Sequence, residues 1–89
     1  MTIVSYDISD DKVRTRFAKM LKKNGAIRLQ CSVYEVHNTK RIIDNLDIKI
    51  KAFAKQFSFD DSVVIFDADP NKITKYGNAI HRDQPIVFL

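Results

Sequence analysis

The chain has 89 residues, 45% of them hydrophobic, a length that accommodates one compact domain and excludes a second core. Fifteen Lys and Arg residues against eleven Asp and Glu residues give a net charge of +4, which alone does not identify a nucleic-acid binder. Acidic residues follow the N-terminus closely, and no apolar run approaches the roughly 18 residues of a membrane span. We therefore expect a cytoplasmic protein without signal peptide or membrane contact, and the small size favours a homodimer.

A strand and a helix are predicted in the N-terminal part. Apolar and polar residues alternate over residues 2–8, as in a strand with one buried face. Asp10 and Asp11 then favour a helix start, because their oxygens accept hydrogen bonds from first-turn amides. We expect this helix over residues 11–24, closed by a left-handed cap at Asn24-Gly25. Its apolar stripe consists of Val13, Phe17, Met20 and Leu21.

Residues 26–37 alternate like a strand, but the alternation changes face before Glu35. The change predicts a bulge, a sharp bend or two short strands that meet near residues 31–34. Cys31 lies in this apolar stretch, and a single cysteine cannot form an intramolecular disulfide. We expect a buried structural thiol there.

A second helix is predicted to begin after Thr39, a good helix cap, and its apolar repeat continues to Phe57. A loop follows over residues 58–61. Four phenylalanines fall on stripes expected to face the core. They are Phe17, Phe53, Phe57 and Phe66.

The C-terminal part predicts a strand, a long loop and an apolar tail. Residues 62–66 are almost all apolar and β-branched or aromatic, which is typical of a central strand. Residues 67–84 contain proline, glycine and both charge signs, and predict a loop with a helical turn around residues 73–76. The tail at residues 86–89 is too short to fold alone.

This order of elements predicts the fold. Strand, helix, one or two strands, helix and strand is the pattern of an α+β ferredoxin-like split βαβ sandwich, with two helices on one face of an antiparallel sheet. We expect a single domain over residues 1–89. The other sheet face then needs a cover.

Asp7 is the first candidate site residue, because it ends the first predicted strand and shares a sheet face with Ser5. A carboxylate there suits Mg²⁺, which takes one or two protein carboxylates and keeps several waters. Two such faces stacked about a two-fold axis would bring two copies of Asp7 together around one metal. The alternative is that Asp7 caps the helix that follows. Zn²⁺ is not expected, since His37 and His81 lie apart in the sequence.

One side of the first predicted helix carries a row of cations, here called the cationic stripe. Arg14 projects from the opposite side of this helix, and Arg28 follows its cap. Cations one helical turn apart suit phosphate contacts that carry affinity without reading sequence, and an ordinary solvated face is the alternative. The second helix mixes its cations with Asp44 and Asp47 and predicts a plain solvated face. The stripe consists of Lys12, Arg16, Lys19 and Lys23, at i, i+4, i+7 and i+11.

One string of the sequence resembles a known family. Tyr6-Asp7-Ile8-Ser9-Asp10-Asp11-Lys12 is similar to the small CRISPR-associated spacer-acquisition proteins, the partners of the CRISPR integrase. The strand start at Asp61-Ser62-Val63 agrees with the same family. Residues after the string that carry the resemblance are Arg14, Arg16, Lys19, Leu21, Gly25, Arg28, Gln30, Ser32-Val33 and Glu35.

The resemblance implies a ferredoxin-like homodimer with packed sheet faces, in which the C-terminal tail adds a strand to the partner's sheet. Packing of the tail on its own sheet is the alternative. The family is described as a metal-dependent endonuclease of RNA or DNA, which makes Asp7 the implied catalytic residue and Mg²⁺ ligand. Its dimer also bridges two integrase dimers and holds the spacer duplex. The implied phosphate contacts are Lys12, Arg14, Arg16, Lys19, Lys23 and Arg28.

The leading hypothesis is therefore a dimeric subunit of CRISPR adaptation that holds duplex DNA, with Asp7-dependent nuclease activity as a second property. Single-stranded RNA is the other candidate substrate. A toxin-type endoribonuclease of related fold is the first alternative. A ribosomal-type RNA-binding domain of the same fold is the second, and it would be monomeric and indifferent to divalent metal.

Overall fold

The computed structural model describes residues 1–77, and the apolar tail at residues 86–89 lies outside the described residues. A sheet of short strands carries two helices, and a 3-10 turn, η1, follows the last strand. In chain order the elements are β1 (Thr2–Asp7), α1 (Asp11–Lys23), β2 (Ile27–Gln30), β3 (Val33–Val36), α2 (Lys40–Ala54), β4 (Ser62–Asp67) and η1 (Pro70–Lys72).

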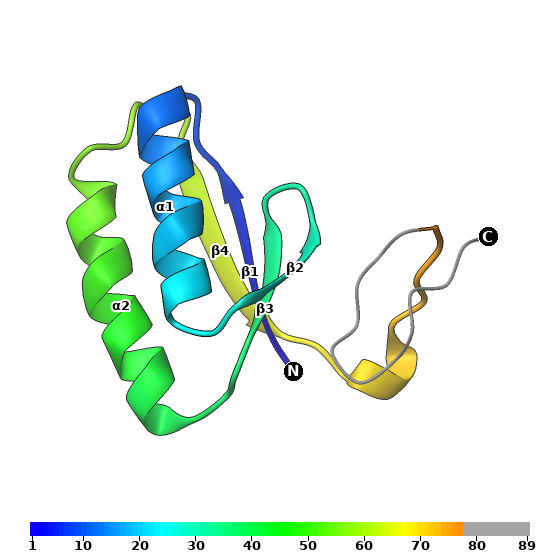
Figure 1. Cartoon of the computed structure of the whole chain (residues 1–89). Helices are drawn as coiled ribbons and strands as arrows, with labels where there is room; N and C mark the ends of the chain where they lie inside the picture. The colour runs from blue at the N-terminus through cyan, green and yellow to red at the C-terminus, as the bar shows by residue number, and fades with distance from the viewer. Residues whose placement is uncertain (78–89) are drawn as a thin grey trace.

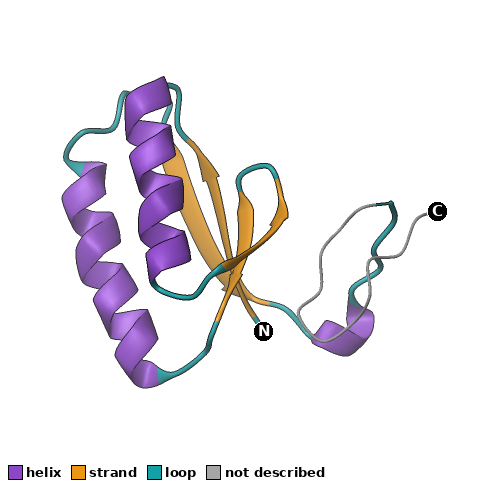
Figure 2. Ribbon diagram, viewed as in Figure 1, coloured by secondary structure: helices purple, strands orange, loops and turns teal. Residues whose placement is uncertain are grey.

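The sheet has the order β2-β3-β1-β4, and each neighbouring pair is antiparallel. Helix α1 connects β1 to β2 across β3, and α2 connects β3 to β4 across β1. Both helices lie on the same side of the sheet (Figure 1). Figure 2 shows the resulting two layers, helices on one side and strands on the other. The ferredoxin-like α+β fold predicted from the order of elements is confirmed.

Local signals explain where α1 begins and ends. The Asp10 side chain accepts a 2.9 Å hydrogen bond from the Val13 amide, as an N-cap residue does. At the other end Gly25 adopts a φ of 82°, and the Ala26 amide donates to the Leu21 carbonyl at 3.0 Å. This left-handed closure satisfies carbonyls of the last turn and is favourable because glycine has no Cβ.

The change of face after Cys31 is explained by two short strands. β2 and β3 pair with a register shift between Arg28 and Gln30, and Cys31-Ser32 forms the turn between them. Ser32 has a φ of 65°, and its carbonyl accepts a 3.0 Å hydrogen bond from the Tyr6 amide, which ties the turn to β1. The prediction of a buried Cys31 is wrong: the thiol is exposed because the residue occupies the turn.

Aromatic rings form the centre of the core between sheet and helices. The Phe17 side chain is fully buried and packs edge-on against Tyr6, with ring centroids 4.7 Å apart, and against Phe53 of α2, at 5.4 Å. Tyr34 stacks on Tyr6 at 6.1 Å. Burial, followed by the neighbouring Tyr34, raises the pKa of Tyr6 to about 12, so its hydroxyl stays neutral.

In the sheet that residues 1–77 form, β4 is an edge strand, whereas a central strand was predicted. Phe66 was expected in the core but is 47% exposed. It pairs with Ile3, which points away from the helices because its neighbour Val4 belongs to the core. Phe66 and Val64 therefore lie on the sheet face that the helices leave uncovered, whereas Val63 packs against the core.

Two predicted helical boundaries also differ. Helix α2 ends at Ala54 rather than near Phe57, because Gln56 and Phe57 donate to carbonyls three residues back and so tighten the chain into turns. The helical turn expected at residues 73–76 occurs at Pro70–Lys72 instead. Asp69 caps that turn by accepting a 2.9 Å hydrogen bond from the Asn71 amide.

Removing the Phe17 ring tests the core. Phe17→Ala is expected to lower the free energy of unfolding by about 3–5 kcal/mol, since a large cavity forms between both layers. Urea denaturation followed by circular dichroism measures the loss. Phe59→Ala is the matched control, because Phe59 is 102% exposed and its removal opens no cavity. Equal losses in the two variants would contradict the assignment of Phe17 as the core residue.

Candidate functional site

Asp7 stands at the end of β1, where it pairs in register with Ser62 of β4. Its side chain is exposed, and among residues 1–77 no hydrogen bond or ion pair engages it. Side chains alternate along a strand, so Asp7 lies with Ile3 and Ser5 on the sheet face opposite the helices. The carboxylate is therefore held by the sheet and open to a ligand or partner.

The alternative role for Asp7, capping the following helix, belongs to Asp10. Asp10 binds the Val13 amide, and Asp11 forms an ion pair with Arg14 within the first turn. Both residues serve the helix start, as predicted. Asp7 has no capping role in this structure.

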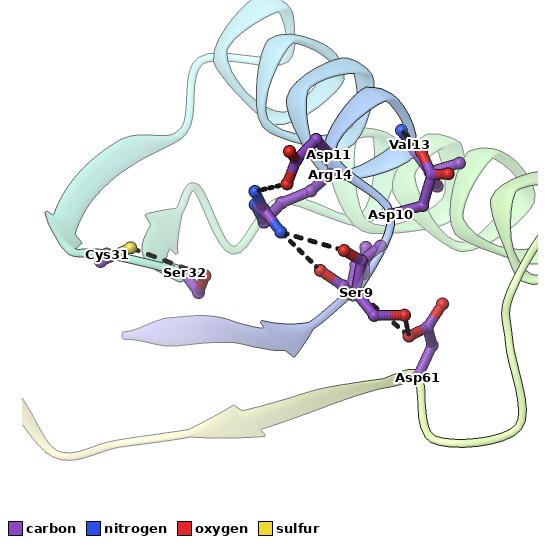
Figure 3. Close-up of polar contacts among 9 residues, drawn as sticks. Ser9, Asp10, Asp11, Val13, Arg14, Cys31, Ser32 and Asp61 are labelled. Carbon is purple, nitrogen blue, oxygen red and sulfur yellow. Dashed lines mark hydrogen bonds and ion pairs between the residues drawn. The ribbon is translucent and has the colours of Figure 1, made fainter.

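A clamp centred on Asp61 joins the two loops beside Asp7 (Figure 3). One carboxylate oxygen of Asp61 accepts hydrogen bonds from the Ser9 amide and the Ser9 hydroxyl, each at 2.9 Å. Its other oxygen accepts from the Ser58 amide at 2.8 Å. These hydrogen bonds, led by that of the Ser9 amide, hold the pKa of Asp61 below its ordinary value. The clamp links the β1–α1 loop to the α2–β4 loop.

Arg14, which was predicted to contact phosphate, forms hydrogen bonds with the β1–α1 loop that precedes its helix. Its guanidinium donates to the Ile8 carbonyl at 3.0 Å and to the Ser9 carbonyl at 3.4 Å, and it contacts the Asp11 carboxylate. Figure 3 shows these contacts converging on the β1–α1 loop. In this structure Arg14 braces the loop that follows Asp7.

The described residues contain no complete set of metal ligands. Within residues 1–77 no group of three or more His, Cys, Asp or Glu side chains is placed to hold an ion. Mg²⁺ needs only one or two carboxylates, with water completing its shell. The exposed Asp7 carboxylate has the chemistry of one such ligand.

Most of the predicted cationic stripe lines one groove. Arg16, Lys19 and Lys23 face the space between α1 and α2, which has a volume of about 440 Å³. Arg16 reaches across it and donates to the Gln56 side chain at 3.2 Å. Lys49 of α2 lines the same groove. Lys49 was not predicted as a binding residue, because the sequence of α2 mixes both charge signs. Its position in the groove depends on how the two helices pack.

The remaining predicted cations lie outside this groove. Lys12 is exposed beside Arg16 near the start of α1, and Arg28 is exposed on β2 at the opposite edge of the sheet from β4. The cations of the groove and the Asp7 carboxylate belong to opposite layers, since the groove is formed by helices and Asp7 lies on the helix-free sheet face. The cationic groove and the Asp7 carboxylate are thus separated in space.

These features define a small ferredoxin-like α+β protein with a cationic helical layer and a free strand-end carboxylate. The family model of the CRISPR associated protein Cas2 matches residues 1–76, and the chain belongs to this family. Membership assigns the protein to CRISPR adaptation, in a family known in general for nuclease-like activity. No curated protein matches the chain. None of the helices in residues 1–77 is long and apolar enough to cross a membrane.

The Asp61 clamp predicts a pH-dependent stability. Because folding lowers the pKa of Asp61, its contribution is present at neutral pH and is lost as pH falls through the folded pKa. Asp61→Asn is expected to lower the Tm at pH 7, and the difference from the parent should narrow below about pH 4. Thermal melts of both proteins between neutral and acidic pH measure this difference in Tm.

Asp60→Asn is the matched control, because Asp60 is an exposed neighbour that makes no hydrogen bond among the described residues. A Tm difference for Asp61→Asn that stays constant from neutral to acid pH would contradict the clamp.

Proposed function

We propose that the protein acts as a homodimer that bridges integrase dimers and holds spacer duplex DNA during CRISPR adaptation. The observation that carries this proposal is the alignment of Arg16, Lys19 and Lys23 along one exposed groove whose lining contains no acidic side chain. Such a row contacts phosphates and gives salt-dependent affinity for nucleic acid without reading sequence. Membership in the Cas2 family supports the same role.

The helix-free sheet face supports the dimer. Val64 and Phe66 are about half exposed there, and Ile3 pairs with Phe66 on the same side. A second copy packed on this face would cover these half-exposed apolar residues.

The outer edge of β4 supports strand addition by the partner. Among the described strands β4 has a neighbour on one side only, β1, so its other edge presents unpaired backbone groups. The tail at residues 86–89 is the proposed strand for this edge in the partner's sheet. Backbone hydrogen bonds would then join the two copies, as in other cases of β-strand addition.

Metal-dependent cleavage of nucleic acid is the second function that we propose. The exposed Asp7 carboxylate, free of a capping role, supports it. Asp7 from each copy would hold Mg²⁺, and the bound ion supplies a nucleophile from water and stabilises charge on the phosphate. The Asp61 clamp and the Arg14 brace keep the loops around Asp7 in place.

Reversing two charges tests the binding role. Arg16→Glu with Lys19→Glu is expected to weaken duplex binding strongly and to flatten the dependence of log K on log salt, because each phosphate contact contributes about 0.9 to that slope. Fluorescence anisotropy with a labelled duplex measures both quantities.

The control is Lys40→Glu with Lys51→Glu, which makes the same change in net charge at lysines that pair with Asp44 and Asp47. If both double variants lose the same affinity and slope, overall charge rather than the groove accounts for binding.

Replacing the carboxylate tests cleavage. Asp7→Asn is expected to abolish Mg²⁺-dependent cleavage of single-stranded RNA and duplex DNA, while the fold and the duplex affinity stay unchanged because the cationic groove lies on the other layer. Gel assays with Mg²⁺ and with chelator measure the activity. Cleavage that persists in the variant, or in chelator, would exclude Asp7 as its centre.

A further inference from the structure

We propose that the groove between α1 and α2 binds one sugar–phosphate strand of duplex DNA, with Lys49 of α2 as a phosphate contact on the wall opposite the α1 cations. This inference rests on the proposed DNA-holding function and adds to it a binding surface and a residue. It differs from a row of contacts on α1 alone, because both walls of the groove take part.

The charges of the groove are uncompensated. Lys49 has no acidic partner in the described part of the chain, whereas two other lysines of the same helix are paired. Lys51 binds Asp47 at 3.0 Å and Lys40 binds Asp44 at 2.9 Å. Lys49 thus joins Arg16, Lys19 and Lys23 around one space whose lining contains no carboxylate.

The shape of this charge suits a strand rather than a single anion. A helix rises about 1.5 Å per residue, so Arg16 and Lys23 are separated by about 10 Å along α1. Lys49 approaches from the other side. Cations on two walls over this length can contact successive phosphates of one backbone.

The rest of the lining fits the sugar and not the base. Met20, Ala52 and Phe53 form an apolar floor on which deoxyribose rings can pack. The uncharged polar side chains of the lining are already engaged: the Asn24 amide donates to the Met20 carbonyl at 2.8 Å, and Gln56 accepts from Arg16. Little remains to hydrogen-bond base edges, so binding should be independent of sequence.

The packing of the Phe53 ring favours duplex over single-stranded DNA as the occupant of the groove. Single-strand binding surfaces usually present aromatic faces on which bases stack. Phe53 is partly buried and packed edge-on against Phe17, at 5.4 Å, so the ring belongs to the core. A groove without a free aromatic face suits a backbone whose bases remain paired.

The test compares two lysines of one helix. In the intact protein, Lys49→Ala should weaken binding of a random-sequence duplex several-fold at low salt and reduce the slope of log K against log salt by about 1. Lys51→Ala should leave the slope unchanged. Lys49→Arg should retain binding, which separates lost charge from altered folding.

Each outcome is decisive. If Lys49→Ala matches Lys51→Ala while the parent binds duplex and Arg16→Glu with Lys19→Glu does not, the groove inference fails and the proposed function stands. If the parent does not bind duplex at all, both fail. A loss that differs between two duplex sequences, or that is larger for single strands than for duplex, would overturn the assignment to a duplex backbone.

Discussion

The packing of Phe17 is the interaction on which the rest of the structure depends. Its ring contacts Tyr6 of β1 on one side and Phe53 of α2 on the other, so one side chain joins the sheet to both helices. The spacing of α1 and α2, and with it the width of the cationic groove, follows from this contact. The same contact packs α1 against β1, which carries Asp7 at its end.

Features set by neighbours in the sequence could be predicted. The cap at Asp10, the closure at Gly25 and the apolar stripe of α1 are local, and the order of elements implied the ferredoxin-like topology. The position of β4 at an edge could not be predicted, because apolar strands look alike whether a helix, another strand or a second chain covers them. The burial of Cys31 was predicted wrongly because a two-residue turn interrupts an otherwise apolar run, and the turn exposes the thiol.

In the candidate site, too, the features set by local sequence could be predicted and those set by tertiary contacts could not. Helical spacing alone brought Arg16, Lys19 and Lys23 to one side, and the strand pattern placed Asp7 at a strand end. The partners of Asp61 lie up to 52 residues away, and Lys49 meets the α1 cations only through helix packing. No local pattern encodes such contacts. The hydrogen bond from Arg14 to the Ile8 carbonyl likewise could not be predicted from the sequence.

The division into two layers has a consequence for how such a protein can change. Substitutions at the free end of β1 alter the acid–base and metal-ligand character of the sheet face without changing the electrostatic field of the helices. Substitutions along the groove do the reverse. Core residues such as Phe17 connect the two, as do the Asp61 clamp and the Arg14 brace, and the replacement of these residues is limited by stability. Selection can therefore act on the two surfaces independently, so that either one can be lost or strengthened while the other is retained.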